Sequence, residues 1–159
     1  MLKITVISVG GMKESYFAEA IAEYEKRAGA YAEMKNINLK EAPLAATRAG
    51  DIAAALDAEG EQILKHLPPR ACKIALCVEG KRYTSPGLSE LIERAASEGR
   101  SDICFVIGSS YGLSDKVKEA SDVRLSMSDL TFPHQLASVM LMEAIYRALD
   151  TARGGKYHK

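Results

Sequence analysis

The last seven residues of the chain, RGGKYHK, carry side chains suited to chemistry on an anionic, aromatic partner. Tyr157 can stack on an unpaired base, and His158 offers an imidazole that accepts protons near neutral pH. Arg153 and Lys156 are cations that attract phosphate. Termini without anchors are usually disordered, and the two glycines of the segment make a fixed conformation unfavourable. The segment is therefore either a loose end or part of a site.

A charged pair, Glu143 and Arg147, interrupts the apolar stretch that precedes this terminus. Their four-residue spacing, with the acid first, favours an ion pair along a helix. Charges on an otherwise apolar helix are unfavourable unless they act at a site or an interface. A helix-stabilising pair and a functional pair both remain open.

The segment GSSYG at 108–112 is a third candidate, because glycines let backbone amides approach a phosphate or a nucleoside. Its spacing matches neither a phosphate loop nor a dinucleotide fingerprint, so a plain glycine turn explains it equally well.

Alternating apolar strands and helices must position these residues. Hydrophobic periodicity and turn residues predict strands at 2–9, 33–39, 73–80, 102–108 and 122–126, and helices at about 14–27, 51–66, 85–97, 114–120 and 133–151. Asp51 is expected to cap the second helix, and Ser85 the third, with Pro86 at its first position. The pattern predicts an α/β fold, with a mostly parallel sheet covered by helices on both faces.

Parallel sheets bind ligands beyond the carboxyl ends of their strands. The segments that follow Cys77, Ile107 and Ser126 are therefore the candidate ligand loops.

Apolar residues cover nearly the whole circumference of the last helix: Leu136, Val139, Met140, Leu141, Met142, Ile145, Tyr146 and Leu149. Such a helix is either enclosed by its own domain or buried against another chain. We favour the second reading, a homodimer packed through this helix.

Composition limits the class of protein. A chain of 159 residues, 47% of them hydrophobic, fits one domain with a sizeable core. The apolar opening MLKITVISVGG is too short to cross a bilayer and lacks a basic leader, which predicts a soluble, cytoplasmic protein. Twenty-one basic and 21 acidic residues give zero formal charge, which argues against an autonomous DNA or RNA binder. The three cysteines lack the spacing of a zinc site and are expected to be buried, reduced thiols.

The stretch SMSDLTFPHQLASVMLMEAIYRALDTARGGKYHK resembles the small bacterial SPOUT-class methyltransferases that modify N3 of a pseudouridine in large-subunit (23S) ribosomal RNA. The similarity spans the whole chain, and LTFPHQ, EAIYRA and the terminal YHK are its most specific motifs. It implies a single domain over 1–159, a C-terminal trefoil knot, S-adenosylmethionine as methyl donor, a homodimer, and 153–159 as an active-site tail. The implied partner is the ribosome, with no DNA, membrane or metal.

The resemblance also assigns residues. The donor site is expected at Leu76, Gly108, Met127, Ser128, Asp129, Leu130, Thr131 and Phe132, which fall in the three candidate loops. On the acceptor side, Arg147 and His158 are the implied catalytic residues, and Arg153, Lys156 and Tyr157 the implied RNA-binding residues.

Two positions depart from the family pattern. Members usually carry a second glycine after Gly108, where this chain has Ser109, and an arginine four positions after His134, where it has Ser138. Two other functions stay open: a nucleotide- or flavin-binding α/β enzyme, and a dimeric ribosome-binding module without activity. The neutral charge favours the assembled ribosome over naked RNA as substrate.

Overall fold

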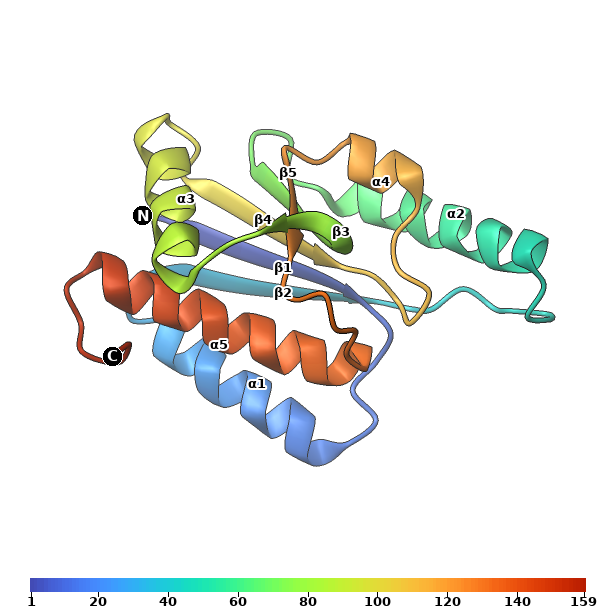
Figure 1. The fold of residues 1–159 in the computed structure, drawn as a ribbon, viewed down its shortest axis with the longest axis horizontal. Helices are drawn as coiled ribbons and strands as arrows, with labels where there is room; N and C mark the ends of the chain where they lie inside the picture. The colour runs from blue at the N-terminus through green and yellow to red at the C-terminus, as the bar shows by residue number, and fades with distance from the viewer.

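Five strands form one sheet in the computed structural model, which describes residues 1–159 (Figure 1). The strands are β1 (Lys3–Val9), β2 (Glu33–Leu39), β3 (Cys72–Arg82), β4 (Asp102–Ile107) and β5 (Val123–Ser126). The helices are α1 (Ser15–Ala28), α2 (Ala49–His66), α3 (Ser85–Ser97), α4 (Asp115–Glu119) and α5 (His134–Ala152).

The sheet has the strand order β2-β1-β4-β3-β5, and every pair is parallel. The α/β prediction is confirmed, and the sheet is wholly rather than mostly parallel. The apolar strands β1 and β4 lie inside the sheet, where both of their faces are covered. The trefoil knot that the resemblance implies stays a prediction.

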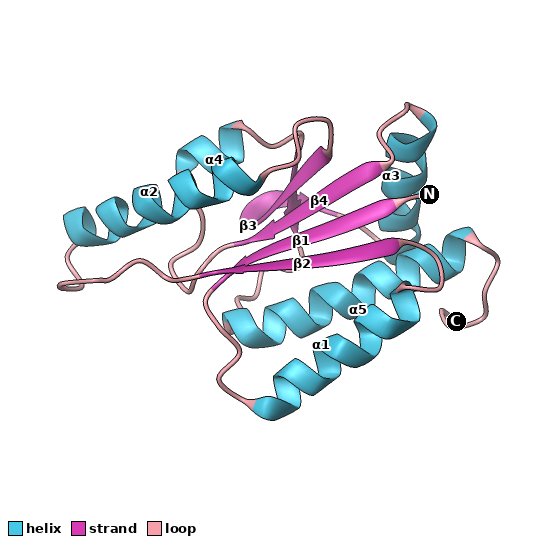
Figure 2. Cartoon of the chain, turned by 180° about the vertical axis from the view of Figure 1, so that it is seen from behind, coloured by secondary structure: helices cyan, strands magenta, loops and turns pink.

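The pleat divides the buried side chains between two layers of helices (Figure 2). On one face, Ile4 and Phe105 contribute to a core that also contains residues of α1, α3 and α5. On the other face, Ile7 packs in a smaller core with Ile63 of α2 and Val117 of α4.

Helix α5 is apolar on most sides because its own chain encloses it. It lies beside α1 and α3 on the larger core, and Leu141, Met142 and Ile145 are each at most 2% exposed. This part of its apolar surface is therefore covered by the chain itself, and the homodimer packed through this helix stays a prediction. Leu136 remains 37% exposed at the start of the helix, and Val139 and Met140 are half-buried. No helix has the length and hydropathy needed to cross a membrane.

Both predicted helix caps are wrong, by three residues for α2 and by one residue for α3. Asp51 lies in the first turn of α2, and its carboxylate accepts a hydrogen bond from Arg48 Nε at 3.0 Å. Thr84, not Ser85, caps α3, and its hydroxyl accepts the Gly87 N–H at 3.0 Å. Ser85 is thereby free to use its hydroxyl in a contact with α5.

Strand β3 extends beyond the predicted end at Gly80, to Arg82. Its pairing with β5 is interrupted by an irregularity between Leu76 and Lys81. Gly80 lies so close to β5 that an added Cβ would sit 2.7 Å from the carbonyl carbon of Arg124. Residues 77–79 bulge out of the strand pairing next to the cavity described below, whereas Gly80 lies against β5.

Candidate functional site

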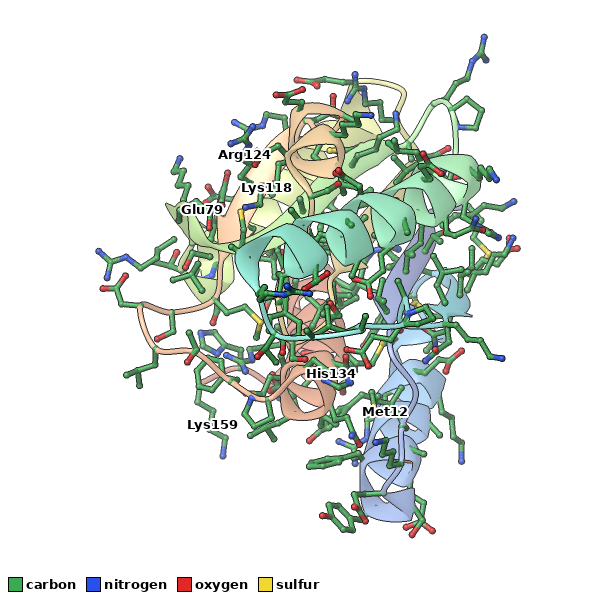
Figure 3. The ribbon with its side chains drawn as sticks, turned by 90° about the vertical axis from the view of Figure 1, so that its right-hand side faces the viewer. Met12, Glu79, Lys118, Arg124, His134 and Lys159 are labelled. Atoms are coloured by element: carbon green, nitrogen blue, oxygen red, sulfur yellow. The ribbon has the colours of Figure 1, made fainter.

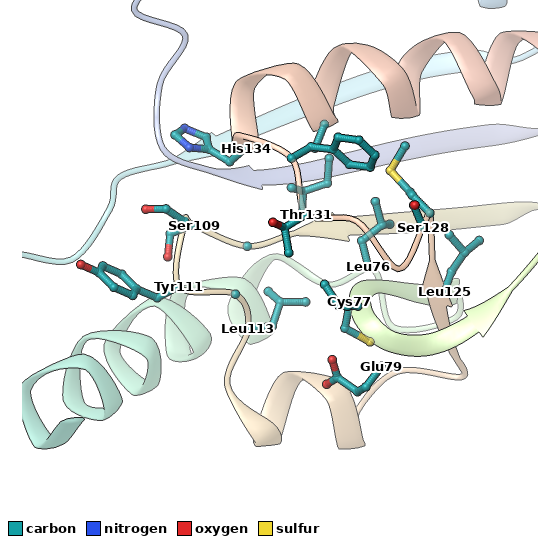
Figure 4. Close-up of a pocket in the computed structure, with 18 of the residues that line it drawn as sticks. Leu76, Cys77, Glu79, Ser109, Tyr111, Leu113, Leu125, Ser128, Thr131 and His134 are labelled. Carbon is teal, nitrogen blue, oxygen red and sulfur yellow. The ribbon is translucent and has the colours of Figure 1, made fainter.

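A cavity of about 330 Å³ opens at the carboxyl edge of β3, β4 and β5 (Figure 4). Its walls come from residues 76–79, 107–113 and 125–134, with Lys118 and Ala137 completing the lining. The three candidate segments therefore meet at one place, as parallel-sheet geometry predicts. One of them, after Cys77, is a bulge within β3 rather than a loop after a strand.

The structure brings most of the expected donor-site residues into this cavity. The lining includes Leu76, Gly108, Met127, Ser128, Leu130, Thr131 and Phe132. Asp129 belongs to the same loop but lies outside the cavity, because its carboxylate points to solvent and pairs with Arg82 at 2.7 Å.

Local hydrogen bonds fix the loop after β5. The Ser126 hydroxyl donates to the carbonyl oxygen of Ser128 at 3.0 Å, and the Ser128 hydroxyl accepts the Leu130 N–H at 3.0 Å. These serines satisfy backbone groups of the loop itself. The loop consequently presents Met127 and Phe132 as apolar wall and leaves Leu130 at the surface, 71% exposed.

The turn at 108–112 depends on a close backbone approach. A Cβ on Gly108 would lie 2.1 Å from the carbonyl oxygen of Gly112, and Gly112 itself has φ +93°. A backbone bridge joins Ser109 and Gly112 across the turn. Both glycines are needed for this shape, which exposes backbone to the cavity.

Ser109 has a structural role that explains its departure from paired glycines. Its hydroxyl donates to Glu59 Oε1 at 2.8 Å, and Glu59 Oε2 accepts the Ala42 N–H at 2.9 Å. Glu59, on α2, is only 5% exposed. The serine therefore fastens the turn to α2 and to the segment that precedes it. No sequence signal indicated Glu59, because its partner is 50 positions away.

Replacing Glu59 by leucine should lower the free energy of unfolding by about 2 kcal/mol or more, because buried donors on Ser109 and Ala42 lose their acceptor. Glu59→Gln is the matched control. Its amide oxygen can accept the Ala42 N–H while its amide nitrogen donates to the Ser109 hydroxyl, so its stability should stay within about 1 kcal/mol of wild type. Urea unfolding followed by circular dichroism measures both. Equal stability of Glu59→Leu and wild type would contradict the anchoring role.

An ion pair lies at the rim of the cavity, where Lys118 of α4 donates to Glu79 of the β3 bulge (Figure 3). This hydrogen bond lowers the pKa of the Glu79 carboxyl, so the rim carries both a carboxylate and an ammonium group near neutral pH. Neither residue was predicted. Both residues lie in or beside the candidate segments, and this position was the only feature of the sequence that pointed to them.

Of the three free cysteines, Cys72 and Cys104 are buried, as expected, whereas Cys77 is half-buried on the cavity wall. Burial raises the pKa of the Cys77 thiol, and raises that of Cys104 to about 12. All three are thus neutral thiols near neutral pH.

His134 also lines the cavity, at the first turn of α5. Its Nε2 is buried without a hydrogen-bond partner and lies against Gly10, where an added Cβ would be only 2.9 Å away. Ser138, one turn later, is 6% exposed and donates to the His134 carbonyl oxygen at 2.9 Å. Ser138 is therefore an inward-facing helix residue, bonded within α5.

Two of the expected acceptor residues, Arg147 and Tyr157, meet in a separate cluster around Glu143. Arg147 donates to both carboxylate oxygens of Glu143, through Nε to Oε1 at 3.1 Å and through Nη2 to Oε2, and to the Ser85 hydroxyl at 2.9 Å. The Tyr157 hydroxyl donates to Glu143 Oε1 at 2.9 Å. Glu143 thus joins the helix pair to the terminal segment, and the functional role of the pair stays a prediction.

This cluster faces a second cavity of about 420 Å³, lined by Glu143, Arg147 and Ser85 among others. Leu125 and Met127 line both cavities, so the start of the loop after β5 separates them. No residue of 153–159 lines the first cavity. The terminal segment lies at the opposite end of α5 from His134 (Figure 1), and Arg153, Lys156 and His158 are exposed.

Comparisons with known proteins agree with this architecture. A family description, "Predicted SPOUT methyltransferase", matches residues 2–158. The chain is 45% identical over 160 residues to the ribosomal RNA large subunit methyltransferase H of Bacillus pumilus (strain SAFR-032), covering 99% of this chain and 100% of that protein.

Solved structures show the same fold at low sequence identity. A probable methyltransferase from Bordetella pertussis Tohama I superposes with a TM-score of 0.55 at 16% identity, covering 92% of this chain and 95% of that one. A Legionella pneumophila protein whose structure holds the bound cofactor SAM gives a TM-score of 0.52 at 12% identity, covering 92% of this chain and 66% of that one.

Proposed function

Since the chain belongs to the SPOUT methyltransferase family, we propose that it transfers a methyl group from S-adenosylmethionine to N3 of a pseudouridine in 23S ribosomal RNA. The observation that carries this function is the full-length, 45% identity to a protein named ribosomal RNA large subunit methyltransferase H. That similarity includes the segments that build the cavity, and it disfavours a nucleotide- or flavin-binding enzyme of another class.

The residues of the first cavity fit the proposed donor. Leu76, Met127 and Phe132 supply apolar walls for an adenine, and the turn at 108–112 supplies backbone groups for its polar edge. The ion pair of Glu79 and Lys118 places a negative and a positive charge at the rim of the cavity. These charges can bind the ammonium and the carboxylate of the donor's methionine part. S-adenosylmethionine brings a methyl group already activated on a sulfonium, so these residues have to align rather than activate it.

The acceptor side must bind the pyrimidine and remove a proton, because N3 loses its hydrogen as the new N–C bond forms. Tyr157 is unsuited to accept it: burial of the ring, with its hydrogen bond to Glu143, raises the pKa of Tyr157 to about 12. His158, next to it, is exposed and is the proposed proton acceptor. Arg147 would stabilise charge on the pyrimidine oxygens, and Arg153 and Lys156 would contact phosphates.

The position of the terminal segment supports a homodimer in which each tail serves the partner's donor cavity. No tail residue reaches the cavity of its own chain, although the tail carries the proposed base. Leu136, Val139 and Met140 form an apolar strip along α5 that this chain leaves at least partly exposed.

Sedimentation at micromolar protein concentration tests whether two chains associate, and a monomer would contradict the proposed homodimer. The proposed place of action is the cytoplasm.

Whole ribosomes should be methylated at least about tenfold faster than free ribosomal RNA, because a chain without net charge has little attraction for naked RNA. The measurement uses labelled S-adenosylmethionine with ribosomes from a strain that lacks the gene, and mass spectrometry then maps the modified nucleoside. Equal rates on both substrates would contradict the expected preference. Ribosome binding without methylation would favour a non-catalytic module.

A further inference from the structure

The terminal segment turns back on α5 at Gly154 and Gly155. Gly154 has φ +73°, and the Gly155 N–H donates to the Asp150 carbonyl oxygen at 2.8 Å. A Cβ on Gly155 would lie 2.2 Å from both carboxylate oxygens of Asp150. The segment is therefore seated directly on this side chain.

Asp150 is 6% exposed, and each of its carboxylate oxygens has a donor. Oδ1 accepts the hydroxyl of Tyr31, from the connection between α1 and β2, at 2.8 Å. Oδ2 accepts the backbone N–H of Tyr157 at 3.1 Å. The carboxylate thus joins the terminal segment to the body of the protein.

Helix stability does not explain an aspartate at this position. A carboxylate in the last turn of a helix faces the negative end of the helix dipole, and α5 has no basic residue there to offset it. Burial adds a desolvation penalty, and Asp150 forms no ion pair. The contact of Asp150 with the tail therefore accounts for a carboxylate at this position.

The tail is held from a second side by aromatic packing. The ring centroids of Tyr157 and Tyr146, which lies on α5, are 4.7 Å apart. The ring of Tyr146 in turn stacks beside that of Tyr31, with the centroids 6.4 Å apart. Lys156 and His158, on either side of Tyr157, remain exposed. The backbone is fixed while the neighbouring basic side chains face outward.

We propose that Asp150 is a positioning residue: seated against Gly155 and aligned by Tyr31, its carboxylate fixes the tail so that Lys156 and His158 are presented to the substrate RNA. This inference rests on the proposed methyl transfer. It predicts that disturbing the contact impairs methylation of ribosomes and leaves donor binding intact, because the contact is remote from the donor cavity.

The test compares Gly155→Ala, Asp150→Ala and Asp150→Asn in the full-length protein, with Gly50→Ala as the control glycine, since nothing lies within 4 Å of a Cβ there. Gly155→Ala and Asp150→Ala should lower kcat/KM on ribosomes about 10- to 100-fold, the usual effect of misplacing a reacting group. Calorimetry should give a Kd for S-adenosylmethionine within about twofold of wild type. Asp150→Asn should retain most activity, because an amide can accept the Tyr157 N–H and donate to the Tyr31 hydroxyl.

Hydrogen exchange gives a readout that does not depend on activity: the Tyr157 amide should exchange faster in Gly155→Ala and Asp150→Ala than in wild type or Asp150→Asn. Gly155 is exposed, so its substitution leaves the core intact even if Asp150→Ala folds poorly. Wild-type kcat/KM in Gly155→Ala, or equal losses in the asparagine and alanine variants, would overturn the inference. An inactive wild-type protein would instead overturn the proposed function, and the exchange rates would still decide whether Asp150 holds the tail.

Discussion

Gly108→Ala is expected to remove most of the affinity for S-adenosylmethionine. The new methyl group would lie 2.1 Å from the carbonyl oxygen of Gly112 and 2.5 Å from its carbonyl carbon. These are backbone atoms on the far side of a short turn, so no side-chain rotation relieves the overlap. The turn has to open, and the backbone groups that it presents to the cavity move with it.

Overpacking of this kind typically costs about 1–3 kcal/mol or more. If the bound state requires the original turn, a loss of about 2–3 kcal/mol corresponds to a roughly 30- to 150-fold weaker Kd. Isothermal calorimetry measures the Kd at a temperature where circular dichroism shows a folded protein. Gly50→Ala, on the exposed start of α2, is the control and should bind the donor normally. Unchanged affinity in Gly108→Ala would mean that the turn at 108–112 is not part of the donor site.

The sequence was sufficient to predict the sheet and the location of the cavity, because both follow from local patterns. Alternation of apolar residues marks β1, a continuous apolar run marks β4, and glycines mark the ends of both strands. Once the strands are parallel, their carboxyl ends must share an edge, and the three segments meet there.

Features made by contacts between distant residues were not predictable. Glu59 meets Ser109 across 50 positions, and Tyr31 meets Asp150 across 119, so neither pair leaves a periodic signal. The bulge in β3 depends on how β5 lies against Gly80, which only the assembled sheet determines. The apolar surface of α5 was ambiguous for a similar reason: its pattern reports burial but not which chain provides the cover.

The two glycines of the tail are expected from the sequence to make a fixed conformation unfavourable, yet Gly154 and Gly155 form a defined turn seated on Asp150. Gly154 has a positive φ, a conformation that other residues rarely adopt. That residues 153–159 belong to the active site stays a prediction, now with a defined geometry for the start of the tail.

Deleting residues 157–159 should therefore reduce ribosome methylation by about 100-fold or more, the range associated with losing a general base, while the Kd for S-adenosylmethionine stays within about twofold of wild type. The deletion removes His158 and the contacts of Tyr157 with Glu143 and Tyr146. None of these residues lines the donor cavity of its own chain, and that cavity is formed without the tail, so binding and catalysis should separate. Calorimetry and single-turnover methylation measure the two quantities on the same preparation.

Two point variants show how much of the lost activity is due to Tyr157 and how much to His158. Tyr157→Phe keeps the ring packing, and Glu143 retains Arg147 as a donor, so activity should fall by less than about threefold. His158→Ala should account for most of the loss. A His158→Ala variant that methylates ribosomes at the wild-type rate would assign the proton to another acceptor. A deletion variant with wild-type activity would remove the tail from the active site altogether.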